Sequence, residues 1–160
     1  AGVAAGTIYH YFEGKEQLIC ELYRFNLARV MSIIQLSLDA DMSYQEKFLK
    51  IWTDLYRFYV KHPNVLIFFE QFVNSPFHVD KSPNQFRGLL YSFFSQGNKL
   101  GQIKSIKPEI LLVLFTGSIH ATAKLHVFGK VTLTRNDLHR IAGILWDGII
   151  QSATDRGPVV

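Results

Sequence analysis

Residues 1–18 of the chain have the sequence AGVAAGTIYHYFEGKEQL, and the interpretation of the whole chain starts from this stretch. Gly2 suits a tight turn with positive φ, and residues 4–11 supply about two turns of helix. Ile8 and Phe12 are four residues apart, so they share the face that packs against the rest of the protein. We therefore expect a turn, a short helix and, from Gly14, a second and longer helix.

The short helix has the small residues and the hydrogen-bonding side chains that a DNA recognition helix needs. Small side chains at its start allow close approach to a DNA groove, and the tips of Thr7, Tyr9 and His10 can donate to or accept from base edges and phosphates. The amino end of the following helix, with Lys15 in its first turn, is suited to bind a phosphate. The predicted DNA contacts are Ala5, Gly6, Thr7, Tyr9, His10, Tyr11 and Lys15.

This stretch resembles the end of the DNA-binding domain of the TetR family of transcriptional regulators. The family's helix-turn-helix begins further upstream, and its first helix and positioning helix have no counterpart before Ala1, so we expect an N-terminally incomplete regulator. The resemblance implies a homodimer that binds double-stranded palindromic operator DNA as a repressor and is released by a small, largely apolar effector. The residues that match the family pattern are Gly2, Val3, Gly6, Thr7, Ile8, Tyr9, Tyr11, Phe12, Lys15, Glu16 and Leu18.

Length and composition agree with one helical body and a soluble protein. The 160 residues are enough for a sizeable core, and the formal net charge of +4 is only a mild indication of a polyanionic partner. Cys20 is the single cysteine, so no intrachain disulfide can form, and no signal peptide is recognisable. The longest apolar run, residues 110–115, is shorter than the roughly twenty residues that cross a bilayer. We expect a cytoplasmic protein without membrane contact.

Apolar spacing and capping signals predict an all-α fold. Gly14 and the Ser43–Glu46 capping box each begin a helix, Pro63 separates two further segments, and Thr134 caps the last helix. No convincing alternating strand is present. The expected helices lie at 14–38, 43–62, 64–73, 82–100, 107–129 and 134–149. We assign residues 1–22 to the remnant of the helix-turn-helix domain and residues 23–160 to a helical-bundle domain for ligand binding and dimerisation.

Aromatic residues on four of these helices are candidates for the walls of an effector pocket. Thirteen Phe and seven Tyr make the composition rich in aromatic residues, which suits a cavity for an apolar molecule, although each aromatic alone also suits an ordinary core. His120 and Lys124 share one helix face, where they could hold an anion or a polar head group. The predicted ligand-binding residues are Trp52, Phe58, Tyr59, Phe68, Phe72, Tyr91, Phe94, Phe115, Ile119 and His120.

The last two helices are candidates for a dimer interface. They are amphipathic, similar in length and joined by a short turn, so two copies can form a four-helix interface across a two-fold axis. The alternative, that their apolar stripe closes only the core of one chain, stays open. The predicted interface residues are Leu125, Phe128, Leu138, Ile141, Leu145, Trp146 and Ile149.

Catalysis receives no support from the sequence. The six histidines form no metal-binding pair at helical spacing, one cysteine excludes a thiolate zinc cluster, and no phosphate loop or nucleophile motif is present. We therefore expect no enzyme activity, no metal and no cofactor. The main alternative to a regulator is a helical module that binds or carries a small molecule without a DNA function.

Overall fold

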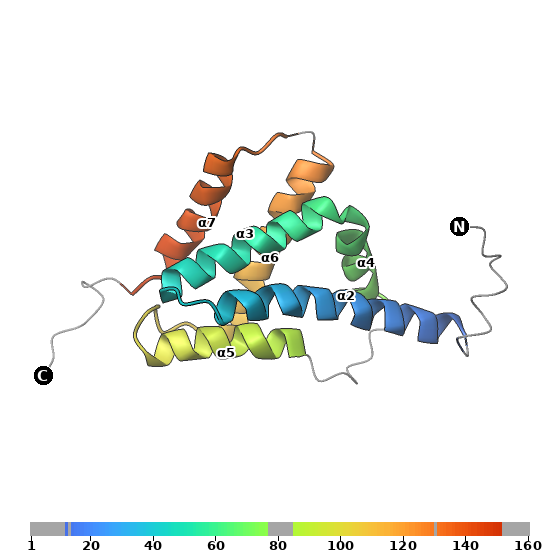
Figure 1. The fold of residues 1–160 in the computed structure, drawn as a ribbon, viewed down its shortest axis with the longest axis horizontal. Coiled ribbons are helices and arrows are strands. Elements are labelled where there is room, and N and C mark those ends of the chain that lie inside the picture. Colours follow the sequence, from blue (N-terminus) through green and yellow to red (C-terminus); the bar gives the residue numbers. More distant parts are fainter. Residues whose placement is uncertain (1–11, 13, 77–84, 130, 152–160) are drawn as a thin grey trace, which may run out of the picture.

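The computed structural model describes residues 12, 14–76, 85–129 and 131–151, and within them the fold is all-α as predicted (Figure 1). The helices are α2 (Lys15–Leu38), α3 (Tyr44–Lys61), α4 (Pro63–Val73), α5 (Gln85–Lys99), α6 (Pro108–Val127) and α7 (Arg135–Ile149). The described residues contain no strand, but Ile103 and Ile150 form one isolated antiparallel bridge. This bridge ties the α5–α6 loop to the end of α7.

The predicted helix starts agree with the structure wherever they fall on described residues. Ser43 and Thr134 each form a complete capping box, with Glu46 and Asp137 respectively. Pro63 and Pro108 occupy the first positions of α4 and α6, where a missing N–H costs nothing. The predicted cap at Ser82 and Pro83 lies outside the described residues.

The end of α5 requires a residue that tolerates positive φ. Gly101 has φ 64°, and the N–H of Gln102 donates to the carbonyl of Gly97 at 2.9 Å. This hydrogen bond returns to the last turn of the helix as in a Schellman cap, so Gly101 turns the chain away from α5.

Helix α3 crosses the middle of the molecule, with α7 on one side and α2 and α5 on the other, and α6 passes behind α3 and reaches α5 (Figure 1). Its apolar face supplies Phe48 and Trp52, whose side chains are completely buried. Phe48 packs edge-to-face on Phe115 of α6, with a centroid distance of 4.9 Å, and lies 5.3 Å from Trp146 of α7. One aromatic core therefore joins α3, α6 and α7.

Hydrogen bonds from buried side chains fix the neighbours of α3. Trp52 Nε1 donates to Ser118 Oγ of α6 at 2.9 Å, and the hydroxyl of Tyr56 lies 2.9 Å from His126 Nδ1 near the end of the same helix. Both contacts satisfy polar groups that would otherwise be costly to bury. They set the register between α3 and α6.

Helix α6 has an apolar face that the described part of the chain does not cover. Considered by length and composition alone, its 20 residues are apolar enough to cross a membrane, a property that the uninterrupted run 110–115 did not reveal. Core helices of soluble proteins have the same property, and one face of α6 packs on α3 and α5. The exposed large apolar residues of α6 are Ile110, Val113, Leu114 and Leu125.

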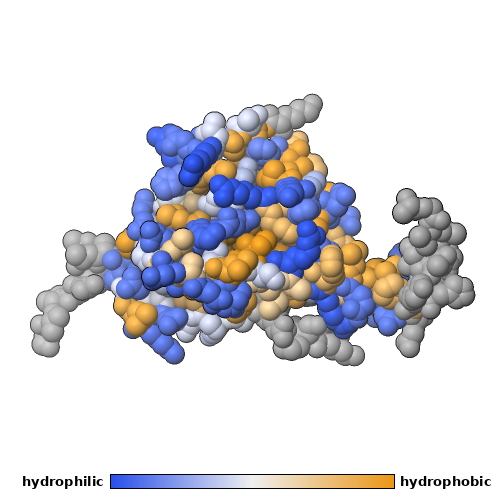
Figure 2. Space-filling model, in the orientation of Figure 1, coloured by the Kyte–Doolittle hydropathy of each residue, from blue (hydrophilic) through white to orange (hydrophobic). Residues whose placement is uncertain are grey.

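Exposed apolar surface also occurs on the N-terminal half of α2. This half extends beyond the other helices (Figure 1), and hydrophobic surface is visible there at the right of Figure 2. Leu22 and Phe25 are exposed in this part of the helix.

Candidate functional site

Of the predicted DNA contacts, the structure describes only Lys15. Ala5, Gly6, Thr7, Tyr9, His10 and Tyr11 lie outside the described residues, so their predicted roles stay predictions. Lys15 is the first residue of α2 and is exposed. Gly14 before it forms no side-chain cap, which leaves the positive end of α2 suited to an anion, although Glu16 in the first turn reduces that potential.

Five of the predicted ligand-binding residues gather around α4, and we call them the α3–α4–α6 junction: Phe58, Tyr59, Phe68, Phe72 and His120. Tyr59 of α3 packs edge-to-face on the His120 ring of α6, with a centroid distance of 4.8 Å. No hydrogen bond from the Tyr59 hydroxyl or the His120 ring to a described residue is present. These two polar groups can therefore bond to a ligand.

The charge state of this junction follows from burial. Burial lowers the pKa of His120, opposed by Glu70 and assisted by Lys124. Burial, and secondarily Tyr23, raises the pKa of Tyr59. At neutral pH the junction thus holds a neutral imidazole and a protonated phenol, which suit an uncharged hydrogen-bonding group better than an ion.

Lys124 does not supply the free cation that the sequence suggested beside His120. Its Nζ lies 2.7 Å from Glu70 Oε1 of α4, so its charge is already balanced. The structure therefore weighs against the sequence-based hypothesis of an anion site at His120 and Lys124.

The other five predicted ligand-binding residues are not part of the junction. Trp52, Phe94, Phe115 and Ile119 are fully buried side chains of the central core, and Phe94 and Phe115 pack edge-to-face at 5.5 Å. Tyr91, in contrast, lies on the surface of α5, where 42% of it is exposed. Apolar spacing alone did not distinguish core, surface and junction aromatics.

Contacts that the sequence did not reveal connect the junction to α2. Tyr23 of α2 stacks on Phe72 of α4 with a centroid distance of 4.1 Å and an interplanar angle of 13°. It also packs edge-to-face on Phe69 at 5.5 Å. The sequence pattern placed Tyr23 only in the apolar stripe of α2, and no local pattern identifies the residues that it contacts.

A second contact with α2 lies at the corner between α3 and α4. Arg29 Nη2 lies 3.0 Å from His62 Nε2, and its guanidinium carbon lies 4.9 Å from the centroid of Phe58. Since a guanidinium only donates, His62 Nε2 is the acceptor. Burial, then Arg29 and Lys61, lowers the pKa of His62, which maintains the neutral acceptor form.

The predicted dimer residues divide into core and surface positions. Leu138, Trp146 and Ile149 are buried inside the single chain, Trp146 to 4% exposure, because they pack toward α3. They offer little area to a second copy, and this part of the predicted set needs correction. Ile141 and Leu145 are half-buried, whereas Leu125, Phe128 and the unpredicted Ile144 are exposed.

A helical bundle preceded by a recognition-helix sequence and a connecting helix defines a class of bacterial DNA-binding regulators. Residues 43–150 match the family model described as "Tetracyclin repressor-like, C-terminal domain". Residues 1–22 match "Bacterial regulatory proteins, tetR family". The chain belongs to the TetR family, which confirms the resemblance drawn from residues 1–18 and makes the protein one of a family of transcription factors rather than enzymes.

Individual relatives agree with this assignment. An uncharacterized HTH-type transcriptional regulator of Haemophilus influenzae is 26% identical over 114 residues, which are 71% of this chain and 61% of that protein. The chain therefore spans less than two thirds of the length of this curated relative. A TetR family transcription regulator from Marinobacter aquaeolei has a similar fold, with a TM-score of 0.84 and 21% identity over 94% of this chain and 81% of the other.

A third protein of this fold was solved with a ligand. The transcriptional regulator FadR from Bacillus subtilis, in complex with stearoyl-CoA, has a TM-score of 0.65 and 17% identity, covering 91% of this chain and 80% of that one. At this identity the likeness concerns the fold alone.

Proposed function

We propose that the protein is a cytoplasmic, homodimeric transcriptional regulator that represses from a palindromic operator and is released by a small, largely apolar effector. The observation that carries this proposal is the double contact between α2 and the α3–α4–α6 junction. Helix α2 follows directly on the recognition-helix sequence, and Tyr23 and Arg29 contact α4 and the α3–α4 corner. A shift of α4 would thus change the position of α2.

The effector is proposed to occupy the α3–α4–α6 junction. Its aromatic rings favour an apolar body, and the neutral His120 and Tyr59 favour an uncharged hydrogen-bonding group on it. The stearoyl-CoA complex of the structurally similar FadR supports an apolar ligand in this architecture without identifying the effector here. To reverse a 99:1 preference for the DNA-binding state, the effector must favour the other state by about 5.5 kcal/mol.

The homodimer is proposed to form through the uncovered faces of α6 and α7. Val113 of α6 and Ile144 of α7 are 67% and 73% exposed, and large exposed apolar residues are typical of an interface. Two-fold symmetry would then present two recognition helices to successive half-sites, about 34–36 Å apart on a palindromic operator.

The proposal is tested with the intact protein in two steps. Operator fragments are first selected from random DNA, and a thermal-shift screen then identifies effectors, whose ability to release the operator is measured by fluorescence anisotropy. We expect His120→Ala to weaken the effector response at least tenfold with DNA affinity unchanged. Tyr91→Ala, which alters an exposed aromatic on α5, is the control and should respond as the wild type does.

Each step can fail separately. If the intact protein selects no DNA sequence, the regulator proposal is wrong and the ligand-binding module without DNA function becomes the better interpretation. If His120→Ala responds to effector as the wild type does, the effector does not occupy the α3–α4–α6 junction.

A further inference from the structure

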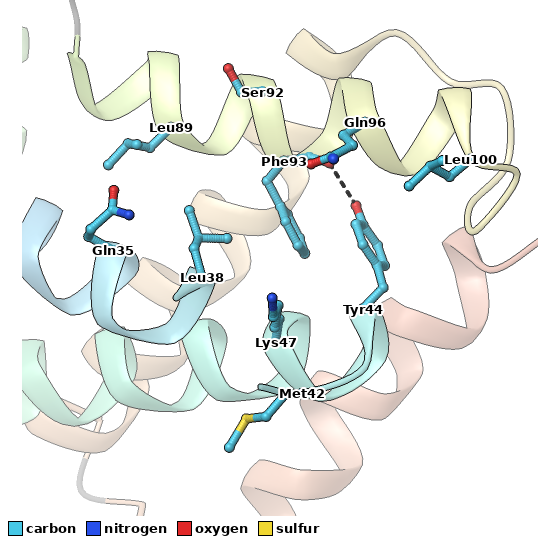
Figure 3. A pocket seen from close by; sticks show the side chains of 10 residues that line it. All are labelled: Gln35, Leu38, Met42, Tyr44, Lys47, Leu89, Ser92, Phe93, Gln96 and Leu100. Atoms are coloured by element: carbon cyan, nitrogen blue, oxygen red, sulfur yellow. Dashed lines mark hydrogen bonds between the residues drawn. The ribbon is translucent and has the colours of Figure 1, made fainter. Parts of the chain in front are cut away.

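A second candidate binding site lies on the side of the molecule where α2 ends, away from the α3–α4–α6 junction. It is a groove of about 350 Å³ between the end of α2, the start of α3 and the length of α5. We call it the Lys47 groove, and Figure 3 shows Lys47 extending into it between Leu38 and Tyr44. None of the predicted ligand-binding residues lines it.

The positive charge of Lys47 is not compensated by the described residues. Lys47 is half-buried, and no hydrogen bond or ion pair joins its ammonium group to the described part of the chain. Lys50 and Lys124 differ in this respect, since Lys50 pairs with Asp54 and Lys124 pairs with Glu70, and Lys61 and Lys99, which form no ion pair with the described residues, are exposed. An ammonium group with reduced access to water and no carboxylate partner favours an anionic ligand.

Two of the carboxylates near Lys47 in sequence, Asp39 and Glu46, have other partners. Asp39 accepts a hydrogen bond from Gln35 Nε2 at 2.7 Å. Glu46 accepts from the backbone N–H and the hydroxyl of Ser43 at 2.8 and 2.7 Å in the capping box of α3. Neither side chain needs Lys47, and Asp41, which is also near in sequence, is exposed and forms no ion pair with Lys47 in the described part of the chain. An anion from outside the chain would therefore meet little competition.

The walls of the groove are largely apolar and well fixed. Leu38, Leu89 and Leu100 contribute aliphatic surface, and Tyr44 stacks on Phe93 with a centroid distance of 4.3 Å. The Tyr44 hydroxyl donates to the carbonyl of Phe93 at 3.1 Å, so the ring holds its position without a ligand. A preformed apolar wall reduces the entropic cost of binding.

We propose that the Lys47 groove binds an amphipathic carboxylate, with its head group on Lys47 and an unbranched apolar chain of about eight to ten carbons along the leucines. At about 30 Å³ for each water-sized group, the volume of about 350 Å³ holds about a dozen non-hydrogen atoms. Such a ligand would contact α2, α3 and α5 together and would stabilise the position of the end of α2. This site is independent of the proposed effector site.

The test is isothermal titration calorimetry of the protein with decanoate below its micelle concentration. We expect a dissociation constant of about 0.1–1 mM for the wild type, in view of the small number of ligand atoms. Lys47→Gln should weaken binding about tenfold, whereas Lys99→Gln, which removes an exposed charge of α5 outside the groove, should change it less than about twofold. Decanol should bind at least about tenfold more weakly than decanoate and should not distinguish Lys47→Gln from the wild type.

Two further variants make the result unambiguous. Leu100→Ser changes an exposed wall residue that the fold does not need, and it should weaken decanoate binding several-fold with the melting temperature unchanged. His120→Ala should leave decanoate binding unchanged. The proposal is overturned if the wild type does not bind decanoate, if Lys47→Gln binds it as tightly, or if affinity follows His120 instead of Lys47.

Discussion

Gly97 lies where α5 approaches Tyr44 of α3, and the substitution Gly97→Ala tests how tightly the wall of the Lys47 groove is packed. A Cβ at this position would lie 2.3 Å from the Tyr44 hydroxyl oxygen and 2.5 Å from its Cζ. Tyr44 cannot easily retreat, because it stacks on Phe93 and donates to the Phe93 carbonyl. Either the ring leaves this position or α5 moves away from α3.

Gains in helix propensity and losses from overpacking together decide whether Gly97→Ala raises or lowers the free energy of unfolding. Replacing glycine by alanine inside a helix gains about 0.5–1 kcal/mol of helix propensity. Overpacking costs about 1–3 kcal/mol, and losing the Tyr44 hydrogen bond costs about 0.5–1.5 kcal/mol more. We therefore expect Gly97→Ala to lower the free energy of unfolding by about 1–3 kcal/mol, which for this chain length corresponds to a melting temperature about 3–10 °C lower.

Gly88→Ala on the same helix is the matched control, since no atom lies within 4 Å of the added methyl group. It should stabilise the protein by about 0.5–1 kcal/mol. In a double-mutant cycle followed by urea unfolding, Tyr44→Leu should remove most of the penalty at Gly97. If Gly97→Ala is as stable as Gly88→Ala, the close approach of α5 to Tyr44 is wrong.

The remaining predictions concern the dimer, the DNA and pH. Val113→Asp should shift the protein to monomers in sedimentation velocity with the fold retained, whereas Leu36→Asp, an equally exposed position on α2, should not; loss of the dimer in both would contradict the interface. Lys15→Ala in the intact protein should weaken operator binding and reduce the salt slope by about one, and an unchanged slope would exclude a phosphate contact. The hydroxyl and then the backbone N–H of Ser43 lower the pKa of Glu46, and those of Thr134 lower the pKa of Asp137. Both caps therefore stabilise the fold above the ordinary carboxyl pKa and lose this contribution as pH falls through the lowered values. Melting temperatures measured from about pH 6 to about pH 3 should fall less steeply for Glu46→Gln and Asp137→Asn than for the wild type.

Local signals in the sequence predicted the helices well, because capping is a local interaction. Ser43 and Glu46, like Thr134 and Asp137, are three residues apart and form their hydrogen bonds without the rest of the chain. The orientation of a helix is not local. Trp146 shares an apolar stripe with Ile149, and only the position of α3 determines that this stripe faces the core.

The candidate sites were harder to predict from the sequence than the helices, because most of them are formed by tertiary packing. The resemblance of residues 1–18 to a known family predicted the DNA-binding segment, since a recognition helix is continuous in sequence. The Lys47 groove combines side chains from three helices, and only the packing of α2 and α5 beside the start of α3 places them around Lys47. The pairing of Lys50 is local, since Asp54 lies four residues further along α3, whereas no acidic residue lies three or four residues from Lys47. The sequence alone therefore shows that Lys47 has no partner on its own helix, but not that other helices surround it.

The position of α2 determines what effector binding can do to DNA binding under the proposed function. About 35 Å separates Leu38 from Lys15 along the axis of this helix, so a tilt of about 5° around its C-terminal end moves Lys15 by about 3 Å. Two such shifts in a dimer change the separation of the recognition helices by up to about 6 Å, against a half-site spacing of about 34–36 Å.

The stack of Tyr23 on Phe72 resists this tilt, and one aromatic pair contributes about 0.5–1.5 kcal/mol. That energy overlaps only the lower end of the range of about 1–3 kcal/mol that typically couples two sites. A ligand that separates these two rings therefore supplies part of the coupling without refolding the bundle, and its other contacts must supply the rest. A carboxylate in the Lys47 groove would act at the other end of α2, where it stabilises the pivot instead of moving it.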